Sequence, residues 1–143
     1  MSKESFIYQL APAAQADMRE FGIVASVTIA QAILESGWGR SALGNNLFGI
    51  KGSGQQQITQ EFINGEWIQI VDGFRVYDSW CDSVRDHSLL LIHNPRYANV
   101  IHERDYRCAS QELQRAGYAT DSQYADKLIR IIEGSELTFF DQI

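Results

Sequence analysis

Residues 17–39 read DMREFGIVASVTIAQAILESGWG, and this stretch decides the fold. Its apolar residues recur at helical spacing around more than one face, which is typical of a helix buried on nearly all sides. Glu35 falls in the last turn, because Gly37 supplies the left-handed residue that commonly ends a helix. The pattern therefore predicts one central buried helix over residues 17–35.

A glycine-rich segment and then a hairpin follow the central helix. Glycines concentrate between residues 37 and 54, so unusual backbone geometry is expected there. Two alternating runs, residues 57–63 and 66–71, are joined by Asn64-Gly65, which is the strongest short-range signal of a β-hairpin. We expect a small antiparallel β-lobe over about residues 54–73.

The hairpin register fixes which side chains share a face. A two-residue turn pairs Glu61 with Ile68. Glu61 then shares a face with Thr59, Ile63, Glu66 and Ile70, whereas the opposite face carries Gln60, Phe62 and Trp67.

The second half predicts three helices, over residues 79–94, over residues 105–116 and from Thr120 onward. The first begins with Ser79 and Asp82 in a capping-box-like pattern, and the last begins in a Thr-x-x-Gln pattern that ends at Gln123. The predicted fold class is α+β, mostly helical, in one domain over residues 1–143 with a two-lobed outline.

Composition excludes several classes of function. The 143 residues contain 12 Lys and Arg against 18 Asp and Glu, a net charge of −6 that argues against nucleic acid or an anionic membrane as the partner. No apolar run reaches the roughly 18 residues that a membrane-spanning helix needs. The N-terminus shows no signal peptide, so we expect synthesis in the cytoplasm and release by a phage or another non-classical route. We also expect a monomer.

Cysteine and histidine spacing gives no sign of a metal site. Cys81 and Cys108 lack neighbours at ligand or redox spacing, so we expect two buried thiols. The spacing of His87, His93 and His102 fits neither a zinc site nor a Ser/His/Asp triad, so no metal or other cofactor is expected. His87 is interpreted as a core or helix-surface residue.

Glu35 is the first candidate for chemistry. The negative end of the helix macrodipole and partial desolvation beside Trp38 both raise a carboxyl pKa. A carboxylic acid that stays protonated near neutral pH is what a general acid requires. The alternative, taken from the helix end alone, is a surface glutamate at a frayed terminus.

The context of Glu35 resembles a known family. Ala32-Ile33-Leu34-Glu35-Ser36-Gly37-Trp38-Gly39 followed by residues 45–52, Asn-Asn-Leu-Phe-Gly-Ile-Lys-Gly, is similar to glycoside hydrolase family 73, the peptidoglycan N-acetylglucosaminidases of bacteria and phages. Further matches follow in order, at residues 59–61, 74–77, 116–121 and 124–125. The resemblance covers about residues 13–133.

This resemblance implies a lysozyme-like fold, in which a helical lobe and a β-lobe flank a groove for a glycan strand of peptidoglycan. Glu35 matches the family's general acid, Glu61 matches the second carboxylate on a mobile β-hairpin, and Tyr118 matches the tyrosine that lines the reaction centre. The reaction implied is hydrolysis of the β-1,4 bond between N-acetylglucosamine and N-acetylmuramic acid. The lack of a signal peptide and of a wall-binding repeat looks most like a phage or prophage lysin, although a domain excised from a larger autolysin or tail protein would look the same.

Further residues in or beside the matched segments are candidates for sugar contacts, and each aromatic one is weighed against a role in the core. These candidates are Trp38, Asn46, Phe48, Gly49, Lys51, Tyr77 and Tyr124. Tyr124 lies on the apolar stripe of the last helix, which favours core packing for that residue.

Two other functions stay open. A lytic transglycosylase uses a similar glutamate and yields 1,6-anhydro products, although residues 48–51 and Glu61 favour the hydrolase. A glycan-binding or phage-tail assembly module without activity is the second alternative. Among hydrolytic routes, inverting, retaining and substrate-assisted chemistry remain possible, and the last makes Glu61 less essential.

Overall fold

The computed structural model describes residues 1–142, except for the side chains of residues 57–59, 70 and 71. Five α-helices and one two-stranded sheet make up the fold. In chain order these elements are α1 (Lys3–Phe21), α2 (Ala25–Ser36), β1 (Gly54–Ile63), β2 (Glu66–Arg75), α3 (Trp80–His93), α4 (Tyr106–Arg115) and α5 (Tyr124–Gly134). Short 3₁₀ turns add η1 (Leu43–Asn45), η2 (Pro95–Tyr97) and η3 (Leu137–Asp141).

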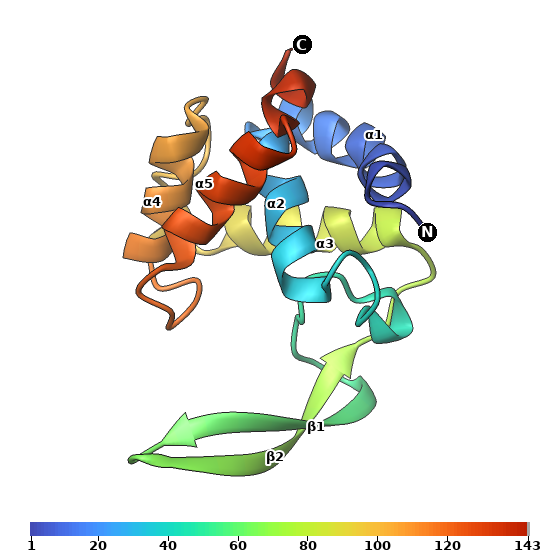
Figure 1. Ribbon diagram of the computed structural model, residues 1–143, viewed down its shortest axis with the longest axis vertical. Coiled ribbons are helices and arrows are strands. Elements are labelled where there is room, and N and C mark those ends of the chain that lie inside the picture. Colours follow the sequence, from blue (N-terminus) through green and yellow to red (C-terminus); the bar gives the residue numbers. More distant parts are fainter. Residues whose placement is uncertain (143) are drawn as a thin grey trace.

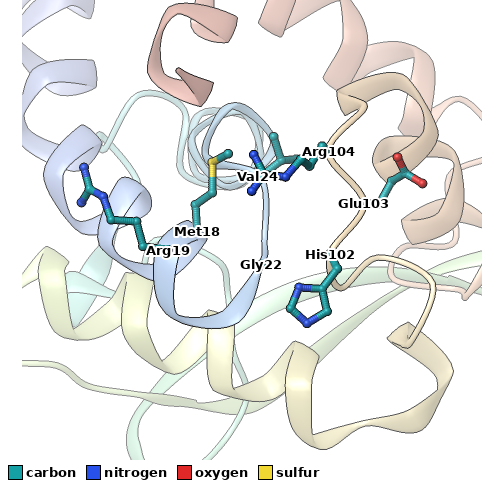
Figure 2. Close-up of a pocket in the computed structure, with 7 residues that line it drawn as sticks. All are labelled: Met18, Arg19, Gly22, Val24, His102, Glu103 and Arg104. Carbon is teal, nitrogen blue, oxygen red and sulfur yellow. The ribbon is translucent and has the colours of Figure 1, made fainter. Parts of the chain in front are cut away.

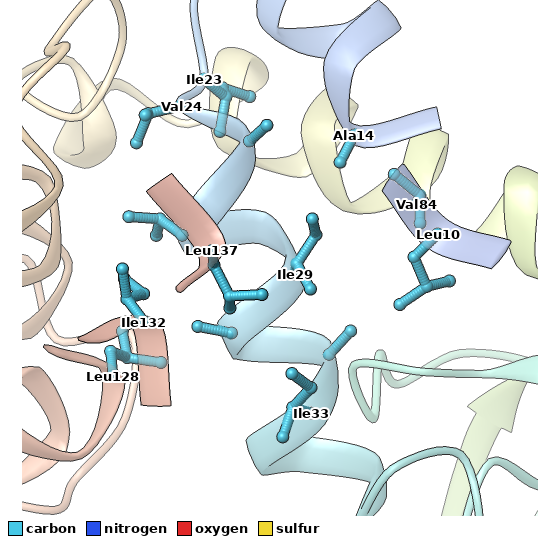
Figure 3. Packing of buried hydrophobic residues seen from close by; sticks show 14 of the residues in the cluster. Leu10, Ala14, Ile23, Val24, Ile29, Ile33, Val84, Leu128, Ile132 and Leu137 are labelled. Carbon is cyan, nitrogen blue, oxygen red and sulfur yellow. The ribbon is translucent and has the colours of Figure 1, made fainter. Parts of the chain in front are cut away.

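Helix α2 forms the centre of the helical body, and the β1–β2 hairpin extends away from that body (Figure 1). Every residue of α2 except Leu34 and Glu35 is buried. Figure 3 shows Ile29 and Ile33 of α2 between apolar side chains of α1 on one side and of α5 on the other. Since full burial of one such side chain contributes about 1.5–3 kcal/mol, packing fixes the position of α2 in the fold. The mostly helical α+β class is confirmed.

The predicted single helix over residues 17–35 is wrong, because the chain breaks at Gly22. Helix α1 begins at Lys3, ends at Phe21 and is followed by Gly22 in the left-handed region, with φ of 76°. The loop before α4 packs against this break, so that a Cβ on Gly22 would lie 2.3 Å from Nδ1 of His102. Apolar spacing continues across the break, which explains why periodicity alone did not reveal it.

The hairpin register is confirmed. Strands β1 and β2 pair antiparallel with Glu61 opposite Ile68, and Asn64 and Gly65 both have positive φ, at 51° and 82°. This is the backbone of a type I′ turn. The paired strands span residues 54–75, two residues beyond the expected lobe. The predicted placement of the Thr59 and Ile70 side chains lies outside the described residues.

The helix starts show where local signals were sufficient. Ser79 accepts a hydrogen bond from the backbone of Asp82 at 3.1 Å, which confirms the predicted capped start of α3. Asp105 accepts one from the backbone of Arg107 at 2.8 Å and caps α4, which begins where the predicted helix over residues 105–116 begins. The predicted start at Thr120 is wrong, because α5 begins at Tyr124. Instead, the Asp121 carboxylate accepts from the backbone of Gln123 at 2.8 Å and holds the preceding residues in a turn.

The C-terminal turn η3 is tied to the start of α2. The Asp141 carboxylate accepts from the backbone N–H of Ser26 at 2.7 Å and from its hydroxyl at 2.6 Å. These contacts satisfy a donor that the N-terminus of a helix otherwise leaves unpaired. The tail residues Leu137 and Phe140 are buried against the core.

Two further expectations concern exposure. Cys81 and Cys108 are free and exposed, so the prediction of buried thiols is wrong. Both lie on helices whose buried residues do not include them. Within residues 1–142, none of the helices combines the length and the apolar character that crossing a membrane requires.

Candidate active site

Glu35 lies in the last turn of α2, where the helix leaves the core. The residue remains accessible to solvent, but protein atoms around its carboxylate replace much of the hydration shell. The surroundings of the carboxylate determine its titration, and desolvation raises the pKa of Glu35 above the ordinary value. The predicted direction of the shift therefore agrees with the structure.

A buried hydrogen-bonded pair, Gln31 and Tyr124, lies on the core side of this carboxylate. Gln31, one helical turn before Glu35, donates from Nε2 to the hydroxyl of Tyr124 at 3.0 Å. That hydroxyl is left to donate to the Glu35 carboxylate, and this bond lowers the pKa of Glu35, partly offsetting desolvation. Tyr124 is only 2% exposed, so it supports the acid from inside the core in place of the expected contact with a sugar.

Tyr118 lies beside the same pair. Its ring stacks on Tyr124, with centroids 5.7 Å apart and planes at 21°. Burial, then the neighbouring Tyr124 and Glu35, raise the pKa of Tyr118 well above its ordinary value. Its phenol is therefore neutral at physiological pH and offers a hydroxyl group, not a phenolate. The structure thus brings together two predicted residues, Glu35 and Tyr118.

The aromatic cluster continues into the core through His87. The Phe48 ring stacks on His87 at 4.0 Å with planes at 17°, and the edge of His87 meets Tyr118 at 6.0 Å. Phe48 is 5% exposed, so it packs beneath the site and does not present the sugar platform that was expected. His87 is a core residue.

Glu61 lies on β1, three residues before Asn64 of the turn. Its hairpin projects from the helical body that carries this cluster (Figure 1). The described ionic partner of Glu61 is Lys51, whose Nζ is 3.5 Å from Oε1 of Glu61 and 3.0 Å from Oδ2 of Asp72. Both members of the Lys51–Glu61 pair are well exposed, so the pair contributes little to stability. The structure places Glu35 and Glu61 on separate elements and gives no contact between the described atoms of the two.

Asn46 clamps the loop that carries the second matched motif. Its amide donates to the carbonyls of Ile50 and Arg75 at 2.8 and 3.0 Å, and its oxygen accepts from the backbone of Ile50 at 3.0 Å. Asn46 is 6% exposed, so these contacts replace the expected contact with substrate. Gly49 in the same loop has φ of 65° and is exposed.

Two further candidates, Trp38 and Tyr77, stay partly accessible. The Trp38 ring meets the edge of Phe6 at 6.1 Å, with Nζ of Lys3 4.9 Å from its centroid. Tyr77 donates to Oδ2 of Asp86 at 2.5 Å. Desolvation first, then the Asp86 hydrogen bond, raise the pKa of Tyr77, so this phenol also stays neutral.

The sequence did not reveal Gln31 or Asp86 as supports of the site. A polar residue in an apolar helix, one turn before a candidate acid, is the signal that could have identified Gln31. Its partner Tyr124 lies 93 residues away, and spacing does not show such a pairing.

Together, these residues form a protonatable carboxyl group at the end of a buried helix, with two neutral phenols beside it. Such a group can deliver a proton to a leaving oxygen.

Comparison with known proteins assigns this arrangement to a family. A family model described as glucosaminidase, mannosyl-glycoprotein endo-beta-N-acetylglucosaminidase, matches residues 11–137. The chain is 37% identical over 153 aligned residues to exo-glucosaminidase LytG of Bacillus subtilis, covering 99% of this chain and 54% of LytG. It is 39% identical over 155 aligned residues to a probable N-acetylmuramidase of Lactococcus lactis subsp. lactis, covering 98% of this chain and 35% of that protein. The chain thus spans about half or less of these relatives.

A solved structure has the same fold. The catalytic domain of the autolysin Auto from Listeria monocytogenes superposes with a TM-score of 0.88 at 37% identity, covering 97% of this chain and 87% of that domain. The expected lysozyme-like architecture is therefore shared with a solved catalytic domain.

Proposed function

The chain belongs to the glucosaminidase family, and on that premise we propose that it is a peptidoglycan hydrolase. The bond cleaved is the β-1,4 linkage between N-acetylglucosamine and N-acetylmuramic acid, with N-acetylglucosamine left at the new reducing end. The observation that carries the proposal is Glu35, a desolvated carboxyl group of raised pKa at the end of α2. The whole chain acts as one catalytic domain at the bacterial cell wall.

Glu35 acts as the general acid. Its raised pKa keeps a proton available for the glycosidic oxygen as the bond breaks. Once the proton has left, the Tyr124 hydroxyl stabilises the carboxylate that remains, because hydrogen bonding favours the charged form. Gln31 holds Tyr124 in the orientation for that role. The two supporting residues thus prepare Glu35 for both of its protonation states.

Glu61 is the second carboxylate, and its place on the hairpin sets a requirement. It acts on the reacting sugar only if the hairpin moves toward the helical body and Glu61 exchanges Lys51 for the substrate or a water molecule. A separation of about 5 Å between carboxyl groups suits a retaining route, and roughly 6.5–9.5 Å suits an inverting one. In a substrate-assisted route the acetamido group attacks, and the neutral Tyr118 hydroxyl supplies a hydrogen bond.

The accessible candidates contact the glycan. Trp38 and Tyr77 keep part of their rings accessible, while Lys51 and Gly49 are exposed. Rings of this kind cover the apolar faces of sugars, and a lysine reaches hydroxyl, acetamido or lactyl groups.

The first test is mass spectrometry of fragments released from purified peptidoglycan and reduced with borohydride, with wild type and Glu35→Gln in parallel. We expect reduced N-acetylglucosamine ends from wild type and a loss of about 10²–10⁴-fold in rate for Glu35→Gln, the range typical of a general acid. Glu66→Gln, a carboxylate on the same hairpin as Glu61, is the matched control and should retain activity.

Other products would replace the proposal. Anhydro-muramic ends would identify a lytic transglycosylase, and reduced muramic ends would identify the muramidase bond that the name of the Lactococcus relative indicates. Absence of release from wild type would favour a binding or assembly module. Comparison of Glu61→Gln with Glu66→Gln, together with the anomer first formed, then separates the three hydrolytic routes.

A further inference from the structure

A hollow lies at the opposite end of α2 from Glu35. It measures about 380 Å³ and is bounded by the last turn of α1, the start of α2 and residues 102–104 (Figure 2). Val24, just before α2, lines this hollow, and at about 1.5 Å rise per residue it lies roughly 16 Å along the helix from Glu35. The hollow is therefore separate from the candidate active site.

The walls of this hollow are joined by fixed backbone contacts. The N–H of His102 donates to the carbonyl of Gly22 at 2.7 Å. His102 itself has φ of 66°, a conformation that residues other than glycine rarely adopt, and its ring packs where a Cβ on Gly22 would lie. Two segments 80 residues apart in sequence are thus held in one arrangement, and the hollow between them is preformed.

The charge that lines the hollow is positive. Arg19 and Arg104 both contribute to its walls, and neither makes an ion pair with any side chain that the structure describes. Glu103, the acidic residue of the lining, instead accepts a hydrogen bond from the backbone of Asp105 at 3.1 Å. Figure 2 shows the Arg104 side chain extending toward Val24, while the Glu103 carboxylate points away from it. Two arginines therefore line the hollow, and neither has an ion-pair partner among the described side chains, in a chain of net charge −6.

We infer that this hollow binds an anionic group of the cell wall, a carboxylate or a phosphate. The guanidinium group presents parallel N–H donors that match either oxyanion. Arg19 contributes one such group from α1 and Arg104 contributes another from the loop before α4, and Figure 2 shows the two groups apart from each other. Cell-wall polymers carry both anions, as carboxylates on peptide stems and as phosphodiesters on attached polymers. The inference rests on the proposed function, because it takes the wall as the target. A positively charged hollow also attracts the anionic wall locally, whereas the negative net charge of the chain repels it.

The experiment measures binding without hydrolysis. Purified walls are sedimented with the Glu35→Gln protein, which leaves the polymer intact, with and without the double substitution Arg19→Gln/Arg104→Gln. The control Arg96→Gln/Arg130→Gln removes the same charge from outside the hollow. We expect about three- to tenfold weaker binding for the Arg19/Arg104 variant, as befits two partly solvated contacts, and binding near the parent value for the control. Equal binding by the two double variants would overturn the inference.

Two treatments of the walls identify the anion. Hydrofluoric acid removes phosphodiester-linked polymers, and carbodiimide amidation neutralises carboxylates. The treatment that removes the difference in wall binding between the parent and the Arg19/Arg104 variant identifies the anion. A difference in binding that persists after both treatments refutes an anionic ligand. Hydrolysis of a short soluble glycan by the Arg19→Gln/Arg104→Gln protein with Glu35 intact should match wild type. If wild type itself fails to hydrolyse, the proposed function fails, while the binding comparison still decides the role of the hollow.

Discussion

His87 gives a test of the packing beneath the active site. Its ring is fully buried, and neither nitrogen has a hydrogen-bond partner among the described residues. Burial lowers the pKa of His87 to about 3, and the neighbouring Asp86 opposes this only in part. In the unfolded chain the ring titrates near 6.5. Below that pH the unfolded chain binds a proton that the folded chain does not bind. The contribution of His87 to the free energy of unfolding is therefore constant above pH 6.5 and falls between pH 6.5 and about 3.

The size of the effect follows from these two pKa values. At pH 5, protonation of His87 stabilises the unfolded chain by about 1.36 kcal/mol for each of the roughly 1.5 pH units below 6.5. This lowers the free energy of unfolding by about 2 kcal/mol. The substitution His87→Phe removes the titrating group and keeps an aromatic ring against Phe48. Any constant packing cost of the larger ring cancels when one protein is compared with itself at two pH values. Wild type should therefore lose about 2 kcal/mol more than His87→Phe between pH 8 and pH 5.

Urea unfolding followed by far-UV circular dichroism at pH 8, 6.5 and 5 measures this difference. His93→Gln is the control, because His93 is exposed at the end of the same helix, and its pH dependence should follow wild type. If His87→Phe loses stability with falling pH as wild type does, His87 does not stay neutral in the folded protein, and the reasoning is refuted.

Three further predictions address the acid, the helix break and the charge. Tyr124→Phe removes the hydrogen bond that lowers the pKa of Glu35, so the decline of kcat/KM at high pH should move to higher pH; an unmoved profile would contradict the assigned contact. Gly22→Ala should destabilise the fold by about 1 kcal/mol more than Gly37→Ala in urea unfolding, because both glycines have positive φ but only Gly22 faces His102; equal losses would argue against the close approach. Lysis of walls should rise from low to moderate ionic strength, since like charges slow encounter, and a monotonic fall in a turbidity assay would oppose this.

Local signals predicted those parts of the fold that depend on a few neighbouring residues. Ser79 and Asp105 bond to backbone groups within three residues, and Asn64-Gly65 sets the hairpin register through its own dihedral angles. The break at Gly22 was missed because the loop around His102, far along the chain, packs against it. The helix start predicted at Thr120 was wrong for a local reason, since the Asp121 side chain competes for the same backbone donors.

The candidate site divides in the same way. Glu35 could be predicted because its position at the helix end follows from one helix and the glycine after it, whereas the contribution of Tyr124 to its pKa could not. Roles for Phe48 and Asn46 could not be predicted, since a motif shows which residues occur together and not which way their side chains point. Phe48 points toward His87, and Asn46 toward the carbonyls of its own loop and of the hairpin.

The buried residues beneath Glu35 include polar groups that lower the stability of the fold. Thr28, Gln31 and His87 each leave a buried polar atom without a described partner, and each such atom costs about 1–3 kcal/mol. Gln31 shows what offsets this cost. Its amide oxygen is unpaired, but its amide nitrogen donates to the Tyr124 hydroxyl and holds Tyr124 beside Glu35. A leucine at position 31 would suit the apolar surroundings of α2 better, but it would leave the Tyr124 hydroxyl free to turn away from Glu35. Gln31 in the interior of α2 is therefore best explained as a stability cost that fixes the geometry of the acid at the end of the helix.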